Sequence, residues 1–264
     1  LIHFIFIDYY TTENIVASMH YFLNNLVAAL YECPPYRMGI YKALLDRIRL
    51  FVTSYHYDDW IANVLDHLGK AKVIYDSITV LRSPSKAPEL HIQMMRQIAD
   101  TLNTYPLLRL RWLRKIVQYN QQYFFYAQAF EGQMHVVALI DRMIRLLDKE
   151  HIPELDYSFV EETAQEKTID INQCNPALRH LLVKDLVPED DVFNSAGLIK
   201  NMNFAIKQGK AAALFWEVRE CYYLFLSIFE SQRKPSKLTR TVMKLGQTYN
   251  KIKEREEAWL STPA

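Results

Sequence analysis

The stretch Pro106–His135 constrains the fold more than any other, because it contains the pattern of two amphipathic helices joined by a short break. Pro106 can open a helix, since the first helical turn does not use its backbone N–H. Apolar residues then recur at helical spacing as far as Val117. The pattern breaks at residues 120–122, and a second helix is predicted over residues 123–147. The stretch therefore predicts a helical hairpin, the unit of bundles and solenoids.

Arg109 interrupts the apolar face of the first of these helices. It precedes Leu113 by four positions and Ile116 by seven, so it lies on that face. An unpaired buried charge is costly. We therefore expect Arg109 to be largely buried and within hydrogen-bond reach of a carboxylate or of backbone carbonyls. The sequence favours a structural ion pair with a neighbouring helix, and the alternative is a cation that binds a partner.

Residues that could carry catalysis or bind a metal do not form a recognisable pattern. His135 lies alone on an apolar helix face, which is typical of a satisfied core or boundary residue. The cysteines, Cys33, Cys174 and Cys221, are far apart and odd in number, which indicates a reducing compartment and predicts a cytoplasmic protein. Phosphate-loop, zinc-protease and nucleophile-elbow motifs are missing. We expect no cofactor, no metal and no catalytic residue.

The same reasoning predicts further helices on both sides of the hairpin. They are expected at about 13–32, 38–54, 60–68, 70–82, 88–102, 198–208, 211–231 and 236–252, with a short one near 177–183. Asn194–Ser195 is expected to cap the helix at 198–208. Gly69 and Gly209 are expected to end two of the helices, and 70–82 is compatible with a strand or a helix. No strand partner is visible, and residues 151–193 read as a long irregular connection. The predicted fold is all-α, with antiparallel helix pairs stacked as a helical-repeat array of the tetratricopeptide or armadillo kind.

The last predicted helix carries a heptad-like seam behind an N-cap at Ser236. The seam consists of Leu238, Val242, Leu245, Tyr249 and Ile252. Gly246 lies within it and is expected to let the neighbouring helix approach closely. The overall formal charge is only +1, so no global electrostatic field favours nucleic acid or an acidic membrane.

Two blocks carry a resemblance to a known family. In the first, the sequence reads P-x-L-R-x-x-W-L, and the matching positions are Pro106, Leu108, Arg109, Trp112 and Leu113, followed by Ala127, Ala129, His135, Ala138 and Leu139. In the second, the matching positions are Tyr222, Leu226, Ile228, Glu230, Leu238, Leu245, Tyr249, Lys251 and Ile252. These blocks resemble lobe A of the second DOCK homology region, the guanine-nucleotide exchange module of DOCK proteins, with most similarity to the zizimin and SPIKE-like branches. The pair Asp141-Arg142 departs from the Ala-Glu often found there.

The resemblance implies a division of the chain and a role. Residues 86–264 correspond to lobe A, with the irregular connection at 151–193, and residues 1–85 are N-terminal helices without an assignment. The family's GTPase-gripping and nucleotide-displacing lobes have no counterpart in the sequence, so no exchange residue is transferred to any position. The implied role is a scaffold and homodimerisation lobe in a regulator of Rho-family GTPases, of Rac or Cdc type, without covalent chemistry. This role involves no nucleic acid and is compatible with peripheral membrane association of the full protein.

A second hypothesis is a generic helical-repeat adaptor in a cytosolic complex. A coding sequence that continued past Ala264 into a β-rich segment would favour the exchange-factor hypothesis. A natural stop codon at that point would favour the adaptor.

Overall fold

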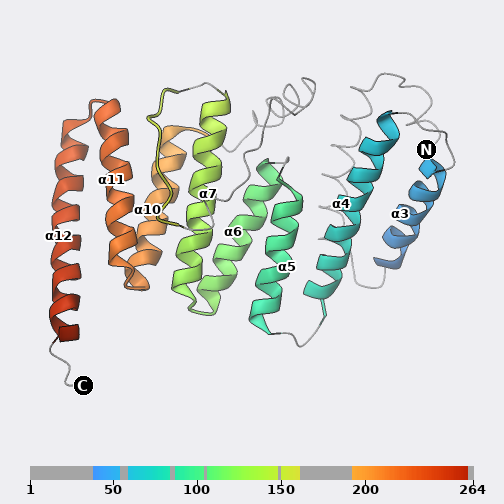
Figure 1. Ribbon diagram of the computed structural model, residues 1–264, viewed down its shortest axis with the longest axis horizontal. Coiled ribbons are helices and arrows are strands. Elements are labelled where there is room, and N and C mark those ends of the chain that lie inside the picture. Colours follow the sequence, from blue (N-terminus) through green and yellow to red (C-terminus); the bar gives the residue numbers. More distant parts are fainter. Residues whose placement is uncertain are drawn as a thin grey trace. The chain divides into compact units, whose positions relative to one another are not determined.

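A computed structural model describes residues 38–53, 59–83, 87–103, 106–147, 150–160 and 192–260 (Figure 1). These residues form α-helices and irregular segments, and no strand occurs among them. The helices are α3 (Met38–Thr53), α4 (Asp59–Leu81), α5 (Pro88–Thr101), α6 (Pro106–Gln122), α7 (Tyr126–Leu147), α10 (Ser195–Ala211), α11 (Phe215–Ser231) and α12 (Pro235–Leu260). The helices predicted at 13–32 and near 177–183 lie outside the described residues.

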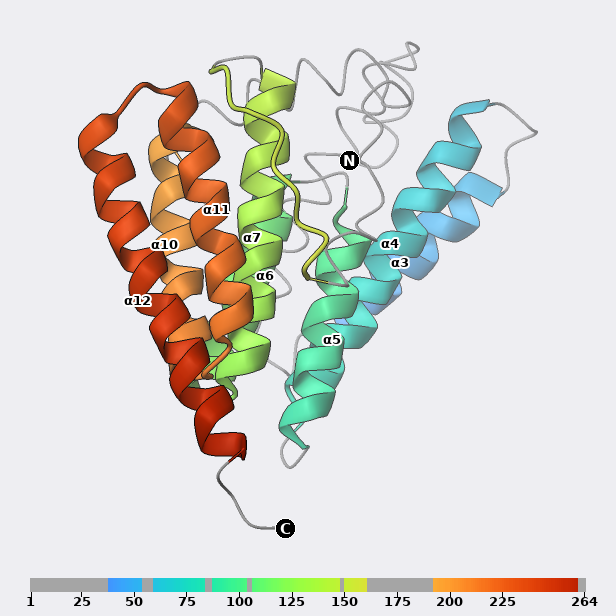
Figure 2. The same ribbon diagram turned by 60° about the vertical axis from the view of Figure 1, so that its left-hand side comes forward.

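The described residues divide into two compact units, and the boundary falls inside α6, after Trp112. In the first unit α3 packs on α4 and α4 on α5. In the second unit α10 packs between α7 and α11, and α11 packs on α12 (Figure 2). Each helix in these pairs thus buries one face against its neighbour. This arrangement confirms the predicted all-α class of stacked helix pairs.

Gly69 does not end a helix. Helix α4 runs through it without a break, so residues 70–81 are helical and belong to the same helix as residues 60–68. A glycine ends a helix when it adopts a left-handed conformation, but no glycine among the described residues has a positive φ. The β-branched residues after Gly69 stay helical because Ile74 and Ile78 lie fully inside the first unit.

Gly209 also lies inside a helix, and its role is close packing. The prediction that it ends α10 is wrong, since the helix continues to Ala211. A Cβ at position 209 would lie 2.6 Å from Cγ2 of Val218 and 3.1 Å from Cδ2 of Phe130. These side chains come from α11 and α7, so the missing side chain lets α10 approach both neighbours. The predicted cap at the start of α10 is confirmed, because the Asn194 side chain accepts a hydrogen bond from the Gly197 N–H.

Three helix ends use the same turn, and none of the three uses glycine. Phe124, Ala213 and Arg233 have φ values of 61°, 56° and 51° and follow α6, α10 and α11. In each turn the next residue donates its N–H to the carbonyl five positions earlier, as in the bond from Leu214 to Gly209. This is the Schellman pattern. It places the break after α6 at residues 123–125 rather than 120–122, and it starts α11 at Phe215 rather than at residue 211.

Helix α12 packs on α11 with a different phase from the predicted seam. Its buried row is Thr241, Leu245, Thr248 and Ile252. Val242 and Tyr249, predicted in the seam, are 55% and 39% exposed. Gly246 faces open space with no atom within 4 Å of a Cβ built on it, so it does not serve the approach of α11. The helix begins at Pro235, which favours the first helical turn, so Ser236 lies inside the helix and is not its cap.

Two glycine-to-alanine substitutions test the packing at Gly209. Gly209→Ala forces a methyl group against Phe130 and Val218 and should lower the free energy of unfolding by about 1–3 kcal/mol. Gly69→Ala, at an open position within α4, should raise it by about 0.5–1 kcal/mol, because alanine is the better helix former. Chemical denaturation measures both changes. Equal effects of the same sign would contradict the assigned role of Gly209.

Candidate interaction surfaces

Arg109 lies in α6 and is buried, with 6% of its surface exposed, as its helical phase predicts. Its Nη2 lies 3.9 Å from Oδ1 of Asp100, the penultimate residue of α5. This is an ion-pair distance, longer than a hydrogen bond to that carboxylate. Trp112, one turn further along α6, is also buried. Both residues therefore belong to the interior of the first unit.

The other residues of the family motif lie in the second unit. Tyr222 of α11 is 2% exposed and Leu245 of α12 is 9% exposed, so both contribute to the core. His135 of α7 is half-buried. Tyr249 points outward from α12. The structure gathers no catalytic constellation from these four residues.

An aromatic cluster around Arg219 is a candidate interaction surface that sequence reasoning missed. The Arg219 guanidinium lies 4.5 Å from the ring centroid of Trp216 and 6.0 Å from those of Tyr223 and Tyr249. The hydroxyl groups of Tyr223 and Tyr249 are 2.8 Å apart and join α11 to α12. Trp216, Tyr223 and Tyr249 remain 48%, 41% and 39% exposed. We call Trp216, Arg219, Tyr223 and Tyr249 the aromatic cluster. The spacing of Trp216, Arg219 and Tyr223 on one helix face was the signal available in the sequence.

A buried carboxylate fixes the irregular segment after α7. Both oxygens of Asp141 accept hydrogen bonds from Arg145, and Arg145 also donates to the carbonyl of Pro153. Removal from solvent raises the pKa of Asp141, and Arg145 partly offsets that rise. Burial likewise raises the pKa of Tyr157, which lies beside this carboxylate. Asp141, which belongs to the pair that differs from the family's usual Ala-Glu, thus makes a structural contact.

The start of α10 is held by a carboxylate from the same irregular segment. The Ser195 N–H donates to Oε2 of Glu150 over 3.0 Å. A negative charge at a helix N-terminus is favourable. Residues 150–160 are irregular, as predicted for the start of the 151–193 connection, but they pack through Ile152, Leu155 and Val160.

Reactive or metal-binding chemistry is not concentrated in the described residues. Cys221 is fully buried, and burial raises the pKa of its thiol, so the sulfur is neither accessible nor ionised. Among the described residues no group of histidine, cysteine and carboxylate side chains is arranged to hold a metal ion. None of the described helices combines the length and apolar character that crossing a bilayer requires.

A groove between α6 and α10 is lined mainly by amide and basic side chains. Its volume is about 630 Å³. The lining includes Arg114, Gln118 and Gln121 on α6, with Lys200 and Asn201 on α10. The floor is formed by Gln133 of α7, whose amide donates to Oδ1 and to the backbone carbonyl of Asn201. Side chains of this kind bind polar ligands, and the lining contains no histidine, cysteine or carboxylate.

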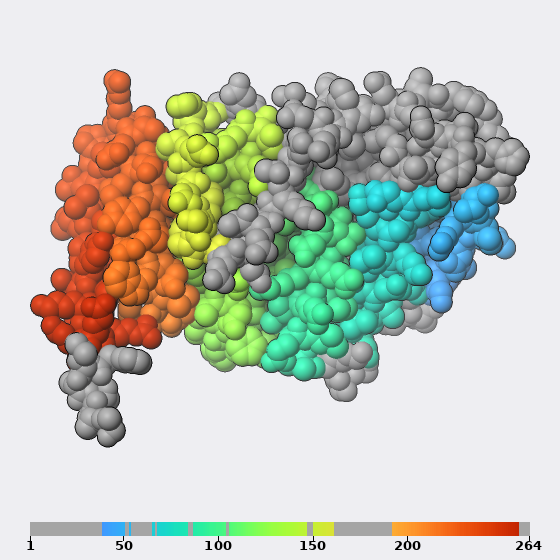
Figure 3. Space-filling view, viewed as in Figure 1, coloured from blue at the N-terminus to red at the C-terminus, as the bar shows by residue number. Residues whose placement is uncertain are grey.

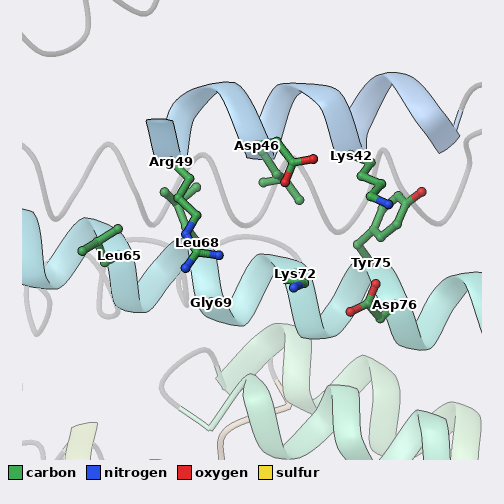
Figure 4. Close-up of a pocket in the computed structure, with 10 residues that line it drawn as sticks. Lys42, Asp46, Arg49, Leu65, Leu68, Gly69, Lys72, Tyr75 and Asp76 are labelled. Carbon is green, nitrogen blue, oxygen red and sulfur yellow. The ribbon is translucent and has the colours of Figure 1, made fainter. Parts of the chain in front are cut away.

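A second groove lies between α3 and α4 in the first unit and has a volume of about 360 Å³. Figure 4 shows Lys42 and Arg49 reaching from α3 toward α4, where Lys72 and Asp76 lie. Leucines such as Leu68 contribute an apolar floor. Charged side chains of both signs surround this floor, and they do not converge on one point. The groove is therefore a surface feature without an evident catalytic use.

Comparison with known proteins decides the family. A profile described as "DHR-2, Lobe A" matches residues 93–254, more than half of the chain. The chain belongs to the DOCK family, as lobe A of its second homology region. This lobe covers the end of the first unit and nearly all of the second. Family membership favours the exchange-factor hypothesis over the generic adaptor.

Several dedicator of cytokinesis proteins are similar to this DOCK-family chain. Dedicator of cytokinesis protein 8 of Homo sapiens is 25% identical over 188 residues, which is 70% of this chain and 9% of the relative. Dedicator of cytokinesis protein 7 of Mus musculus is 24% identical over 205 residues, 74% of this chain and 9% of the relative. The chain thus spans about a tenth of the length of these relatives. No solved structure matches significantly.

Removal of the Arg145 side chain tests how much its ion pair with the buried Asp141 carboxylate stabilises the fold. Arg145→Ala leaves Asp141 without the cation that lowers its pKa, so that pKa should rise further and the ionised form should destabilise the fold. Because Arg145 is 35% exposed, we expect the free energy of unfolding to fall by only about 1–2 kcal/mol at neutral pH. The loss should shrink in mild acid, where Asp141 becomes protonated. Chemical denaturation at about pH 7 and about pH 5 measures the loss of unfolding free energy at each pH.

Arg240→Ala serves as the control for this experiment, because Arg240 is exposed on α12 and should change stability little at either pH. An equal loss for Arg145→Ala at both pH values would assign the effect to the contact with Pro153 instead.

Proposed function

We propose that this chain is the helical scaffold and dimerisation lobe of a DOCK-type guanine-nucleotide exchange factor for Rho-family GTPases of Rac or Cdc type, acting in the cytoplasm. The match of residues 93–254 to lobe A is the observation that carries the proposal. Nucleotide exchange itself is assigned to other lobes of the full protein. The chain acts as part of a regulator and performs no covalent chemistry.

The exposed flank of α11 and α12 supports dimerisation with a second copy. It combines the aromatic cluster with Val242, which is 55% exposed on the same side of α12 as Tyr249. Tryptophan, tyrosine and arginine are the residues that dominate binding energy at protein interfaces. Their side chains are already oriented by stacking and by the bond between Tyr223 and Tyr249, so ordering them on association costs little.

Gly246 also supports dimerisation through this surface. It lies one turn from Val242 on α12, and the space above it is open. A glycine inside an exposed helix costs about 1 kcal/mol relative to alanine. Nothing in the described part of the chain packs into this position, whereas a helix of a second copy could approach the backbone there. An interface of usual size would bury about 800 Å² on each partner.

Charge insertion at this surface tests the dimer. The chain should be a dimer at micromolar concentration by size-exclusion chromatography with light scattering, and Val242→Glu should convert it to a monomer by placing a charge in an apolar interface. Gln247→Glu is the matched control, because it introduces the same charge at an exposed position on the opposite flank of α12. A monomeric parent chain, or a dimer that tolerates Val242→Glu, would contradict the proposal.

A nucleotide-release assay tests the assignment of exchange to other lobes. The chain alone should not accelerate release of a fluorescent guanine nucleotide from a Rac- or Cdc-type GTPase, since scaffold and dimer contacts do not displace nucleotide. A clear acceleration by this chain would overturn that assignment, whatever its oligomeric state.

A further inference from the structure

The segment of residues 231–253 concentrates the positive charge of the chain. It contains seven basic residues and no acidic residue. Because the whole chain carries +1 and this segment +7, the remainder carries −6. The small net charge of the chain therefore conceals a strong local excess of positive charge in the turn after α11 and in most of α12.

Five of these basic residues lie together at the beginning of α12. Arg233 and Lys234 occupy the turn between α11 and α12, and Lys237, Arg240 and Lys244 follow at spacings of three and four residues. All five are exposed. Spacings of three and four place the helical residues on one side of α12. We call these five residues the basic face.

The basic face is not neutralised by the described part of the chain. None of its five residues forms an ion pair with a described acidic side chain. Lys234 donates to Oε1 of Gln232, and the ammonium group of Lys237 lies 5.4 Å from the ring centroid of Phe229. The positive end of the α12 dipole adds to the same field.

We propose that the basic face binds the surface of an anionic lipid bilayer. Clusters of four to eight lysine and arginine residues on a helix are attracted to acidic lipids. Met243 lies beside Arg240 and Lys244 on the outer side of α12 and is 65% exposed. An apolar side chain among cations can enter the headgroup region of a bilayer, whereas it gains nothing from a phosphate backbone. Figure 3 shows atoms of α12, coloured orange-red to red, at the edge of the second unit.

This surface is separate from the one proposed for dimerisation. With 100° between successive residues, Lys237, Arg240 and Lys244 lie on one flank of α12, and Val242 and Tyr249 lie on the other. The contacts agree with this phase, since Lys237 reaches Phe229 while Tyr249 reaches Tyr223. Membrane binding therefore does not depend on the dimer, and each surface can be altered while the other stays intact.

Vesicle sedimentation tests the proposal with the purified chain. It should bind vesicles of phosphatidylcholine containing about 30% phosphatidylserine, and it should not bind phosphatidylcholine alone. Raising the salt from about 0.1 M to about 0.5 M should release it, because screening weakens attraction between exposed charges. Removal of two cations, in Arg240→Gln/Lys244→Gln, should weaken binding roughly 30-fold.

Two further variants separate the basic face from folding and from net charge. Ser236→Glu adds a negative charge in the first turn of α12, where it favours the helix, yet it should weaken vesicle binding. Lys200→Gln/Lys207→Gln makes the same change in net charge on exposed residues of α10 and should bind as the parent does. Circular dichroism and thermal melting confirm that each variant is folded.

Several outcomes would overturn the proposal. They are absent or salt-insensitive binding to the acidic vesicles, equal weakening by the α10 control, and binding of duplex nucleic acid in place of vesicles. Loss of binding in Val242→Glu with the basic face intact would also contradict it, because it would make the membrane contact depend on the dimer.

Discussion

The close packing of α10 between α7 and α11 is the contact on which the second unit depends. Gly209 makes it feasible, because any side chain there would meet Val218 and Phe130 at less than the usual van der Waals separation. The second unit also depends on the three non-glycine Schellman turns. They reverse the direction of the chain with a fixed geometry after α6, α10 and α11. Helices with ordinary apolar stripes can then stack as successive layers.

Among the described elements, helix α12 packs closely on α11 alone. Its inner row buries two threonines with two large aliphatic residues, and each threonine hydroxyl bonds a carbonyl of its own helix. The other faces of α12 are exposed and available for contact with other molecules. One flank presents apolar and aromatic groups and the other presents cations, which is why two separate interactions are proposed for it.

A scaffold role agrees with the distribution of polar groups. Arg109, Asp141 and Gln133, among the buried polar residues, contact side chains or carbonyls of the chain itself. Such contacts specify how helices pack and occupy these three side chains. Family membership identifies this architecture as lobe A of the second DOCK homology region.

The sequence by itself determined the all-α class, the order of the described helices apart from the division of α4, the burial of Arg109 and the cap at Asn194, because periodicity and local capping are properties of short segments. It misassigned Gly69 and Gly209, since a glycine can end a helix or admit a neighbour, and only the position of Phe130 and Val218 distinguishes the two. The seam of α12 was also off by one position, which moved Val242 and Tyr249 to the surface. Only the tertiary structure decided which flank of α12 is free, because that depends on where α11 packs rather than on the α12 sequence.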